Sequence, residues 1–473
     1  MNGTEALVRL RTEANAHLFP EDAAAPVLSV RALILYPTIA VLGAGVQLLR
    51  MWDSRPLDSI WAEDGGIWLS DALYRGFFHN FTTPYSGYLR ELPRLVAEPV
   101  SRLPVDWYAP AMAIVGALIV SGCALFVWRA SAAHIRNPYL RASLAAMVLL
   151  LPVVGTEAVA NVSNSIWPLV FACFFALLWR PRSLTAAVGA AILVLVAALS
   201  SIAVVFFLPL WLIRLVAARD RRDLVIVVAF AIGLAMQFGL AGGEIGLNGE
   251  VGHPHGNSPV PACKAFSTHP CWNWELVPAY AQRIVGGAVA GQQINGELWK
   301  AIGPPLLVVQ GLGLIALVAV ALRERQTRIL VPLTIVISIA MFLVVGWQRW
   351  GAGGSFFYWP EDRFTGGTSY LITPTLLLLT AIILQLDAAI RKRSDEPVGS
   401  VRRKALAAAV VVFILAAALV GFHVGDRRIR GSISWSDEVA QAHAVCGQPD
   451  SPPDVVVPTD EVFTIRVPCD RLR

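Results

Sequence analysis

Residues 109–127 read APAMAIVGALIVSGCALFV, nineteen consecutive residues without a charged side chain. A helix that crosses the hydrocarbon core of a bilayer needs about 20 predominantly apolar residues. Similar apolar stretches recur along most of the chain, at approximately 32–49, 109–127, 143–160, 166–178, 184–199, 201–217, 224–241, 304–322, 329–345, 370–389 and 405–421. The pattern predicts an all-α polytopic membrane protein with about eleven transmembrane helices.

The composition supports the same fold class. Hydrophobic residues make up 56% of the 473 residues, charged residues only 15%, and the mean hydropathy is +0.60. Soluble domains usually carry about 25% charged residues. We therefore expect the bilayer to solvate most of this chain. The first apolar stretch is followed by no small-residue cleavage pattern, which predicts a retained helix and not a cleaved signal peptide.

The basic residues predict the orientation of the helices. The net charge of +5 is not gathered into one patch, so we expect no nucleic-acid partner. The arginines recur in short clusters, and an excess of Arg and Lys marks cytoplasmic loops. Six clusters fall on one side if the N-terminus is cytoplasmic and the C-terminus extracytoplasmic: 9–31, 129–141, 180–182, 219–222, 323–328 and 391–404. A seventh cluster, at 427–430, disagrees with this orientation. Residues 184–217 could also form one tilted helix broken near Ser200 and Ser201, although two short spans fit the clusters better.

This orientation divides the chain into three parts. Residues 1–31 form a cytoplasmic segment, 32–421 the transmembrane domain and 422–473 an external tail. The long loops at 50–108, 242–303 and 346–369 are all external, so we expect the chemistry to take place outside. In the tail, two runs rich in β-branched residues, 455–457 and 462–467, flank a predicted turn and indicate a small β unit.

Four cysteines lie in predicted external segments, as the pairs Cys263 with Cys271 and Cys446 with Cys469. An oxidising compartment favours a disulfide in each pair. A zinc site is the alternative for the first pair, because three histidines lie beside it: His253, His255 and His269. Their spacing matches no standard zinc pattern, so we predict no metal site there.

The first external loop carries the strongest candidates for catalysis, in WAEDGG at 61–66 and PYSGYLRELPR at 84–94. Glu63 or Asp64 could act as a general base. Arg90 and Arg94 could hold a phosphate, and Tyr88 could stack on a sugar. Each of these features also has a purely structural interpretation. The acidic pair could form a simple Asp-Gly turn, the arginines could pair with nearby glutamates, and the aromatic residues could be anchors at the membrane surface. The flanking stretches 67–78 and 89–102 predict interfacial helices.

Two further charged residues are candidates for substrate binding. Glu157 lies in a short external turn, where a carboxylate at membrane depth is costly unless it faces a polar cavity or forms helix–helix hydrogen bonds. Arg363 lies in the loop at 346–369, where an external arginine departs from the usual charge distribution. Phosphate binding and ordinary loop charge are the two interpretations of Arg363.

These features together resemble the GT-C superfamily of membrane glycosyltransferases, which use polyprenyl-phosphate-linked sugars. The resemblance covers the topology of most of the chain and about forty residues of motif, from Trp61 to Arg94. It implies that Glu63 or Asp64 is the catalytic acid of the first loop, that Glu157 is the second acidic position and that Arg363 is a late-loop phosphate ligand.

The sequence therefore predicts an inverting glycosyltransferase of a bacterial plasma membrane. It would transfer a sugar from a polyprenyl-phosphate donor to a cell-envelope acceptor, surrounded by membrane lipids. We expect no cofactor, while dependence on a divalent metal and the oligomeric state are left open. The alternatives are a transporter or flippase of a lipid-linked saccharide and a non-catalytic protein of envelope assembly.

Overall fold

The computed structural model describes residues 11–21, 30–85, 87–218, 220–241, 276–350, 368–391, 397–424, 433–460 and 463–473. Long apolar helices dominate this part of the chain. Eleven of them correspond one for one to the predicted stretches: α2 (Val30–Arg50), α6 (Tyr108–Ala130), α7 (Pro138–Leu150), α8 (Ile166–Leu178), α9 (Leu184–Ser200), α10 (Leu208–Ala217), α11 (Arg221–Ala241), α14 (Pro305–Arg323), α15 (Leu330–Trp350), α16 (Ile372–Arg391) and α17 (Pro397–Val420).

The helices suit a membrane environment. Five are long and apolar enough to cross a bilayer by length and composition, and six shorter ones are also apolar. On α14, apolar side chains such as Val309 and Ile315 are more than 60% exposed, which in a bilayer means contact with lipid. The predicted polytopic helical fold is confirmed, and the protein is a multi-pass membrane protein.

One end of the helix bundle gathers the predicted cytoplasmic loops, and we call it the inner end. Arg180, just after α8, donates 2.8 Å hydrogen bonds to Asp223 at the start of α11 and to Asn15 of the N-terminal segment. The same guanidinium reaches the carbonyl oxygen of Ala217, the last residue of α10, at 3.1 Å. These contacts place the helix ends that carry arginine clusters side by side.

The opposite end, the outer end, is joined by Arg50. This buried side chain donates to the carbonyl oxygens of Leu149 and Leu151 at the end of α7 and of Phe422 after α17. These carbonyl groups lie at the C-terminal ends of two helices, where backbone acceptors lack partners within the helix. Helices α2, α7 and α17 all end on this side. The chain therefore crosses the bundle an odd number of times between the start of α2 at the inner end and the end of α17 at the outer end.

The uncertain region at 184–217 forms a hairpin. Helix α9 begins near the inner end, and at its other end the Ser200 hydroxyl accepts a 2.9 Å hydrogen bond from the backbone of Leu92 in the first loop. A 3-10 segment, η6 (Ile202–Phe207), then reverses the chain, and α10 returns to Arg180. The structure therefore has two helices in this region, as the arginine clusters favour.

Helix α7 ends earlier than predicted, at Leu150 and not near residue 160. Pro152 disfavours helical geometry in the residue before it, which explains the end of the helix. The following residues form an irregular turn, with Val162 and Ser163 fully buried. Val162 and Ser163 of this turn donate backbone hydrogen bonds to Asp64 of the first loop.

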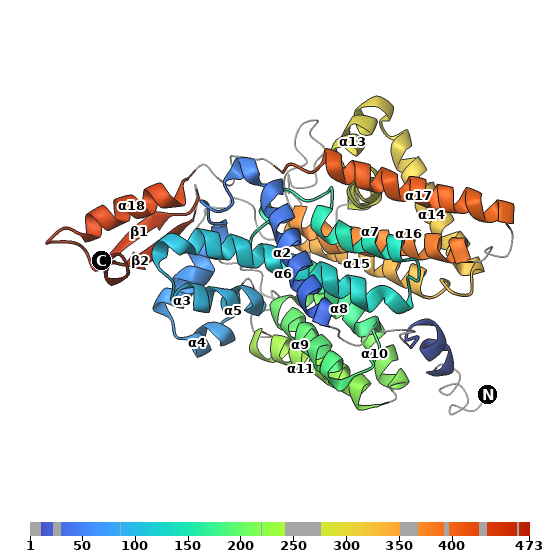
Figure 1. Ribbon diagram of the computed structural model, residues 1–473, viewed down its shortest axis with the longest axis horizontal. Helices are drawn as coiled ribbons and strands as arrows, with labels where there is room; N and C mark the ends of the chain where they lie inside the picture. Colours follow the sequence, from blue (N-terminus) through green and yellow to red (C-terminus); the bar gives the residue numbers. More distant parts are fainter. Residues whose placement is uncertain are drawn as a thin grey trace, which may run out of the picture.

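The first loop and the C-terminal residues form one layer at the outer end. The loop contains η2 (Asp64–Leu69), α3 (Ser70–Tyr74), α4 (Phe77–Thr82) and α5 (Glu91–Val100). The C-terminal unit, residues 433–473 as far as described, contains α18 (Trp435–Cys446) and the antiparallel strands β1 (Asp454–Pro458) and β2 (Thr464–Pro468). Figure 1 shows this unit beside α3 and away from the helix at 11–17. The predicted interfacial helices and small β unit are both present.

The loop predicted at 242–303 includes a second helical region. Residues 276–302 form α12 (Leu276–Ala279), the π-helical η7 (Tyr280–Gly286) and α13 (Gly287–Ile302). Helix α13 continues η7 as far as Gly291, whose φ of 72° and ψ of 168° interrupt the helix. Beyond this kink the chain folds back, because Gln282 and Asn295 each donate a side-chain hydrogen bond to the other's backbone carbonyl. Tyr280 contacts Ser338 of α15 through their hydroxyl groups at 3.0 Å, so this segment packs into the bundle.

Candidate functional site

Glu63 lies at the N-terminal end of the π-helical segment η2, in the first loop. Its side chain is 24% exposed, whereas that of the neighbouring Asp64 is almost wholly buried. The indole nitrogen of Trp61 donates a 2.8 Å hydrogen bond to Glu63 Oε2. Arg90 Nη1 lies 3.9 Å from Glu63 Oε1. Glu63 is thus an oriented carboxylate that solvent or a substrate can reach.

Arg90 is buried between aromatic rings. Its Nε donates a 3.0 Å hydrogen bond to Tyr88 Oη, and its guanidinium carbon lies 5.4 Å from the ring centres of both Tyr85 and Tyr88. The two tyrosines share a tight turn in which each backbone amide donates to the other's carbonyl. Gly87 completes the turn with a φ of 83°, a conformation that favours glycine.

A small cavity adjoins this turn. Its volume is about 110 Å³, and its walls include Tyr88, Trp167 and Tyr370 together with residues 201–203, 205–206 and 344–345. The rings of Trp167 and Tyr370 meet edge to face at 5.1 Å. Tyr88 therefore connects Arg90 to a partly aromatic cavity near the outer end of α8 and α15, and Glu63 lies on the Nη1 side of the same guanidinium. This arrangement suits an apolar ligand with an anionic group at its end.

The surroundings of Asp64 do not suit its predicted role as a general base. Its carboxylate accepts hydrogen bonds from the backbone amides of Val162 and Ser163, both at 2.8 Å, and from the Ser163 hydroxyl at 2.5 Å. A buried carboxylate with several donors is stabilised as the anion and is a poor proton acceptor. Asp64 thus ties the first loop to the turn after α7.

Arg94 is also separated from the predicted phosphate site. It lies in the first turns of α5, and its Nη1 donates to the backbone carbonyls of Asn80 and Thr83. The same nitrogen lies 3.5 Å from Glu91 Oε1. Pro93 occupies the first turn of α5, where proline is tolerated. Arg94 therefore holds the connection between α4 and α5 and does not share the tyrosine-lined position of Arg90.

Glu157 connects two distant parts of the outer end. Its Oε1 accepts 2.8 Å hydrogen bonds from the Thr368 hydroxyl and the Ser369 backbone amide. Burial raises the pKa of this carboxyl group, while the hydrogen bonds and the nearby Arg283 oppose the shift. The sequence interpretation missed Arg283, which lies more than a hundred residues away. The only sequence signal for Arg283 is that this arginine lies outside the clusters that mark the predicted cytoplasmic loops.

Some predicted positions lie outside the described residues. These include Arg363 and both members of the Cys263–Cys271 pair. The other predicted disulfide is confirmed, since Cys446 and Cys469 are bonded with their Cα atoms 5.3 Å apart. Among the residues that the structure describes, no three histidine, cysteine or acidic side chains are grouped as metal ligands.

Comparisons with known proteins give little at the level of sequence. No protein-family model matches the chain, and no curated protein matches it. Among solved structures, the oligosaccharyltransferase of Archaeoglobus fulgidus, in complex with Zn and sulfate, matches with 14% identity and a TM-score of 0.39. The match covers 87% of this chain and 56% of that one, so the chain spans little more than half the length of the archaeal enzyme. At this similarity the match assigns neither an activity nor a substrate to the chain.

Proposed function

We propose that this protein is a membrane glycosyltransferase that uses a polyprenyl-phosphate sugar and acts at its outer end. The Glu63–Arg90 pair carries the proposal. It joins a reachable carboxylate to a buried guanidinium 3.9 Å away. Base and phosphate ligand are the two groups that this reaction needs from a protein. The acceptor would be a hydroxyl-bearing molecule of the cell envelope of a bacterium.

In the proposed reaction, Glu63 accepts the proton of the acceptor hydroxyl as that oxygen attacks the anomeric carbon. The bond between the anomeric carbon and the phosphate oxygen breaks at the same time, with inversion. The lipid phosphate leaves with an additional negative charge. Arg90 stabilises this charge, because a guanidinium can donate two parallel hydrogen bonds to phosphate. Trp61 holds Glu63 in place through its indole N–H.

The remaining predicted residues take supporting roles in this proposal. Tyr88 orients Arg90 and borders the cavity, where it could stack on the sugar. Glu157 keeps 368–369 attached to the turn after α7, and Arg283 provides a positive charge near this carboxylate. Arg363 remains a predicted phosphate ligand. A divalent metal is not required by the proposed step.

The test is product formation from a labelled polyprenyl-phosphate sugar by purified protein in lipid nanodiscs. Glu63→Gln removes the basic oxygen and keeps the size of the side chain. We expect its turnover to fall by about 10²–10⁴-fold, the usual contribution of a positioned base. The KM for the donor should change little.

Asp64→Asn is the matched control, because it makes the same chemical change one residue away. The carboxamide would place an N–H₂ against the amides of Val162 or Ser163, so we expect a loss of stability of about 1–3 kcal/mol. Turnover per folded molecule should fall less than in Glu63→Gln. Equal rates for Glu63→Gln and wild type would place the base elsewhere. If wild type forms no product but moves the labelled lipid across liposomes, the protein is a flippase.

A further inference from the structure

The C-terminal unit shares an apolar core with the first loop. Trp435 of α18 stacks on Tyr108 at 6.3 Å, and its indole donates a 3.0 Å hydrogen bond to the carbonyl of Val105. The same core contains Ile60 and Trp68 from the first loop and Val457 and Ile465 from the strands. Two segments more than 300 residues apart in the chain are thus packed as one body.

The C-terminal unit also packs closely against the two glycines after Asp64. A Cβ atom on Gly65 would lie 2.5 Å from Thr459 Cγ2, and one on Gly66 would lie 2.7 Å from Phe463 Cδ1. Thr459 and Phe463 belong to the turn between β1 and β2, where Thr459 Oγ1 donates to the Phe463 carbonyl at 3.0 Å. Glycine is therefore required here by the packing of the C-terminal turn.

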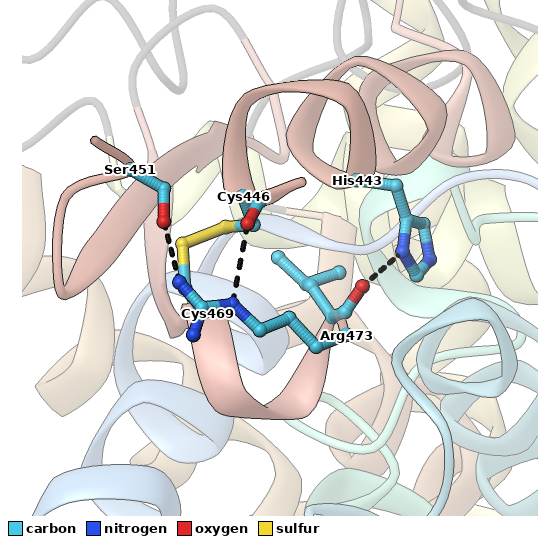
Figure 2. The surroundings of a disulfide bond; sticks show 6 residues. His443, Cys446, Ser451, Cys469 and Arg473 are labelled. Atoms are coloured by element: carbon cyan, nitrogen blue, oxygen red, sulfur yellow. Dashed lines mark hydrogen bonds between the residues drawn. A yellow bond between two sulfur atoms is a disulfide. The ribbon is translucent and has the colours of Figure 1, made fainter. Parts of the chain in front are cut away.

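The segment that follows Glu63 is held from two sides. Asp64 is hydrogen-bonded to the turn at 162–163. The next two residues, Gly65 and Gly66, pack against Thr459 and Phe463. On the C-terminal side, the Cys446–Cys469 disulfide joins α18 to the end of β2, as Figure 2 shows. Arg473 Nε also donates to the Cys446 carbonyl at 3.2 Å. The turn that contacts the glycines thus belongs to a cross-linked unit.

We propose that the C-terminal unit is a positioning element for Glu63 and acts through the contact of Thr459 and Phe463 with Gly65 and Gly66. This inference rests on the proposed role of Glu63. A displacement of η2 moves the neighbouring carboxylate relative to Arg90. A shift of about 1 Å at a catalytic group can cost about 10²-fold in rate. Thr459 and Phe463 are positioning residues, since they contact the glycines and not the substrate site.

The test uses a clash and its relief. Gly65→Ala inserts a methyl group against Thr459 Cγ2, and Thr459→Ser removes that carbon while it keeps the hydroxyl. Alanine otherwise favours helical backbone over glycine, so a loss of activity must come from contacts of the new methyl group. These are with Thr459 Cγ2 at 2.5 Å and with Ile60 Cγ2 at 3.0 Å, and the double variant isolates the first. Gly76→Ala is the control, because its Cβ would meet open space in the same loop.

We expect Gly65→Ala to lower kcat by about 10–100-fold with little change in donor KM. The Gly65→Ala/Thr459→Ser double variant should recover most of this loss, and Gly76→Ala should match wild type. If Gly65→Ala only destabilised the fold, it would lower the yield of folded protein and leave kcat per folded molecule unchanged. A wild-type kcat in Gly65→Ala, or no recovery in the double variant, overturns the proposal.

Hydrogen–deuterium exchange gives a second readout that does not depend on activity. Amides at 60–69 should exchange faster in Gly65→Ala and return toward the wild-type rate in the double variant. If these rates respond as expected but wild type transfers no sugar, the positioning contact holds and the proposed glycosyltransferase function fails. If the rates are the same in all variants, the contact does not hold η2 and the positioning proposal fails.

Discussion

The guanidinium group of Arg90 lies between two tyrosine rings, and that of Arg94 holds two backbone carbonyls of its own loop. Lysine keeps the charge of either residue but cannot form the bidentate contact. Arg90→Lys should therefore raise the donor KM by about tenfold, the effect of losing one charged hydrogen bond. Arg94→Lys should lower the thermal unfolding temperature with little effect on KM. The reverse pattern would make Arg94 the phosphate ligand.

Glu91 makes the stability of the outer layer depend on pH. Its carboxyl group is fully buried beside Arg94, and burial raises its pKa from 4.5 to about 8, against the opposing effect of the arginine. The folded state thus binds this proton more tightly than the unfolded state. The stability from this group is fully present below about 4.5 and is lost as pH rises through about 8.

The test is the free energy of unfolding as a function of pH. For wild type we expect Glu91 to contribute a decline of up to about 1.4 kcal/mol per pH unit across this window. Glu91→Gln keeps the shape and carries no titrating proton, so its curve should be flatter. Parallel curves for the two proteins would show that Glu91 does not titrate in this range.

At the scale of elements, the disulfide decides how firmly the C-terminal unit is closed. It joins residues 23 positions apart. A loop of this size gives about 3 kcal/mol in the chain-entropy model. Cys446→Ser/Cys469→Ser should unfold the unit at lower denaturant, as measured by protease cleavage between α18 and β2. Reductant should reproduce this loss in wild type and have no effect on the double variant. Equal cleavage rates would show that packing alone holds the unit.

At the scale of the whole molecule, the arrangement of the two ends predicts a topology. Ser183, next to Arg180, is exposed at the inner end, and Asp450 is exposed in the C-terminal unit. In intact cells, a membrane-impermeant maleimide should label Asp450→Cys and not Ser183→Cys. Both should react after permeabilisation, and unsubstituted protein gives the background. Labelling of Ser183→Cys in intact cells would reverse the proposed orientation.

The helices, the two groups of loops and one disulfide could be predicted from the amino-acid sequence alone. These depend on local properties, because a membrane helix must satisfy its backbone hydrogen bonds within one apolar stretch. The arginine clusters likewise follow the loops directly. The pairing of Cys446 with Cys469 followed from their presence in one short segment that is predicted to be external.

Which carboxylate a substrate can reach, and why two glycines follow the acidic pair, became clear only from the folded structure. Glu63 and Asp64 are adjacent, but Asp64 is buried and accepts hydrogen bonds from residues 162–163. The residues that pack against Gly65 and Gly66 come from the C-terminal turn. The neighbourhood of Glu157 and Arg283 is likewise formed by distant segments. The role of an ionisable group depends on its burial and its donors, and packing between remote segments sets both.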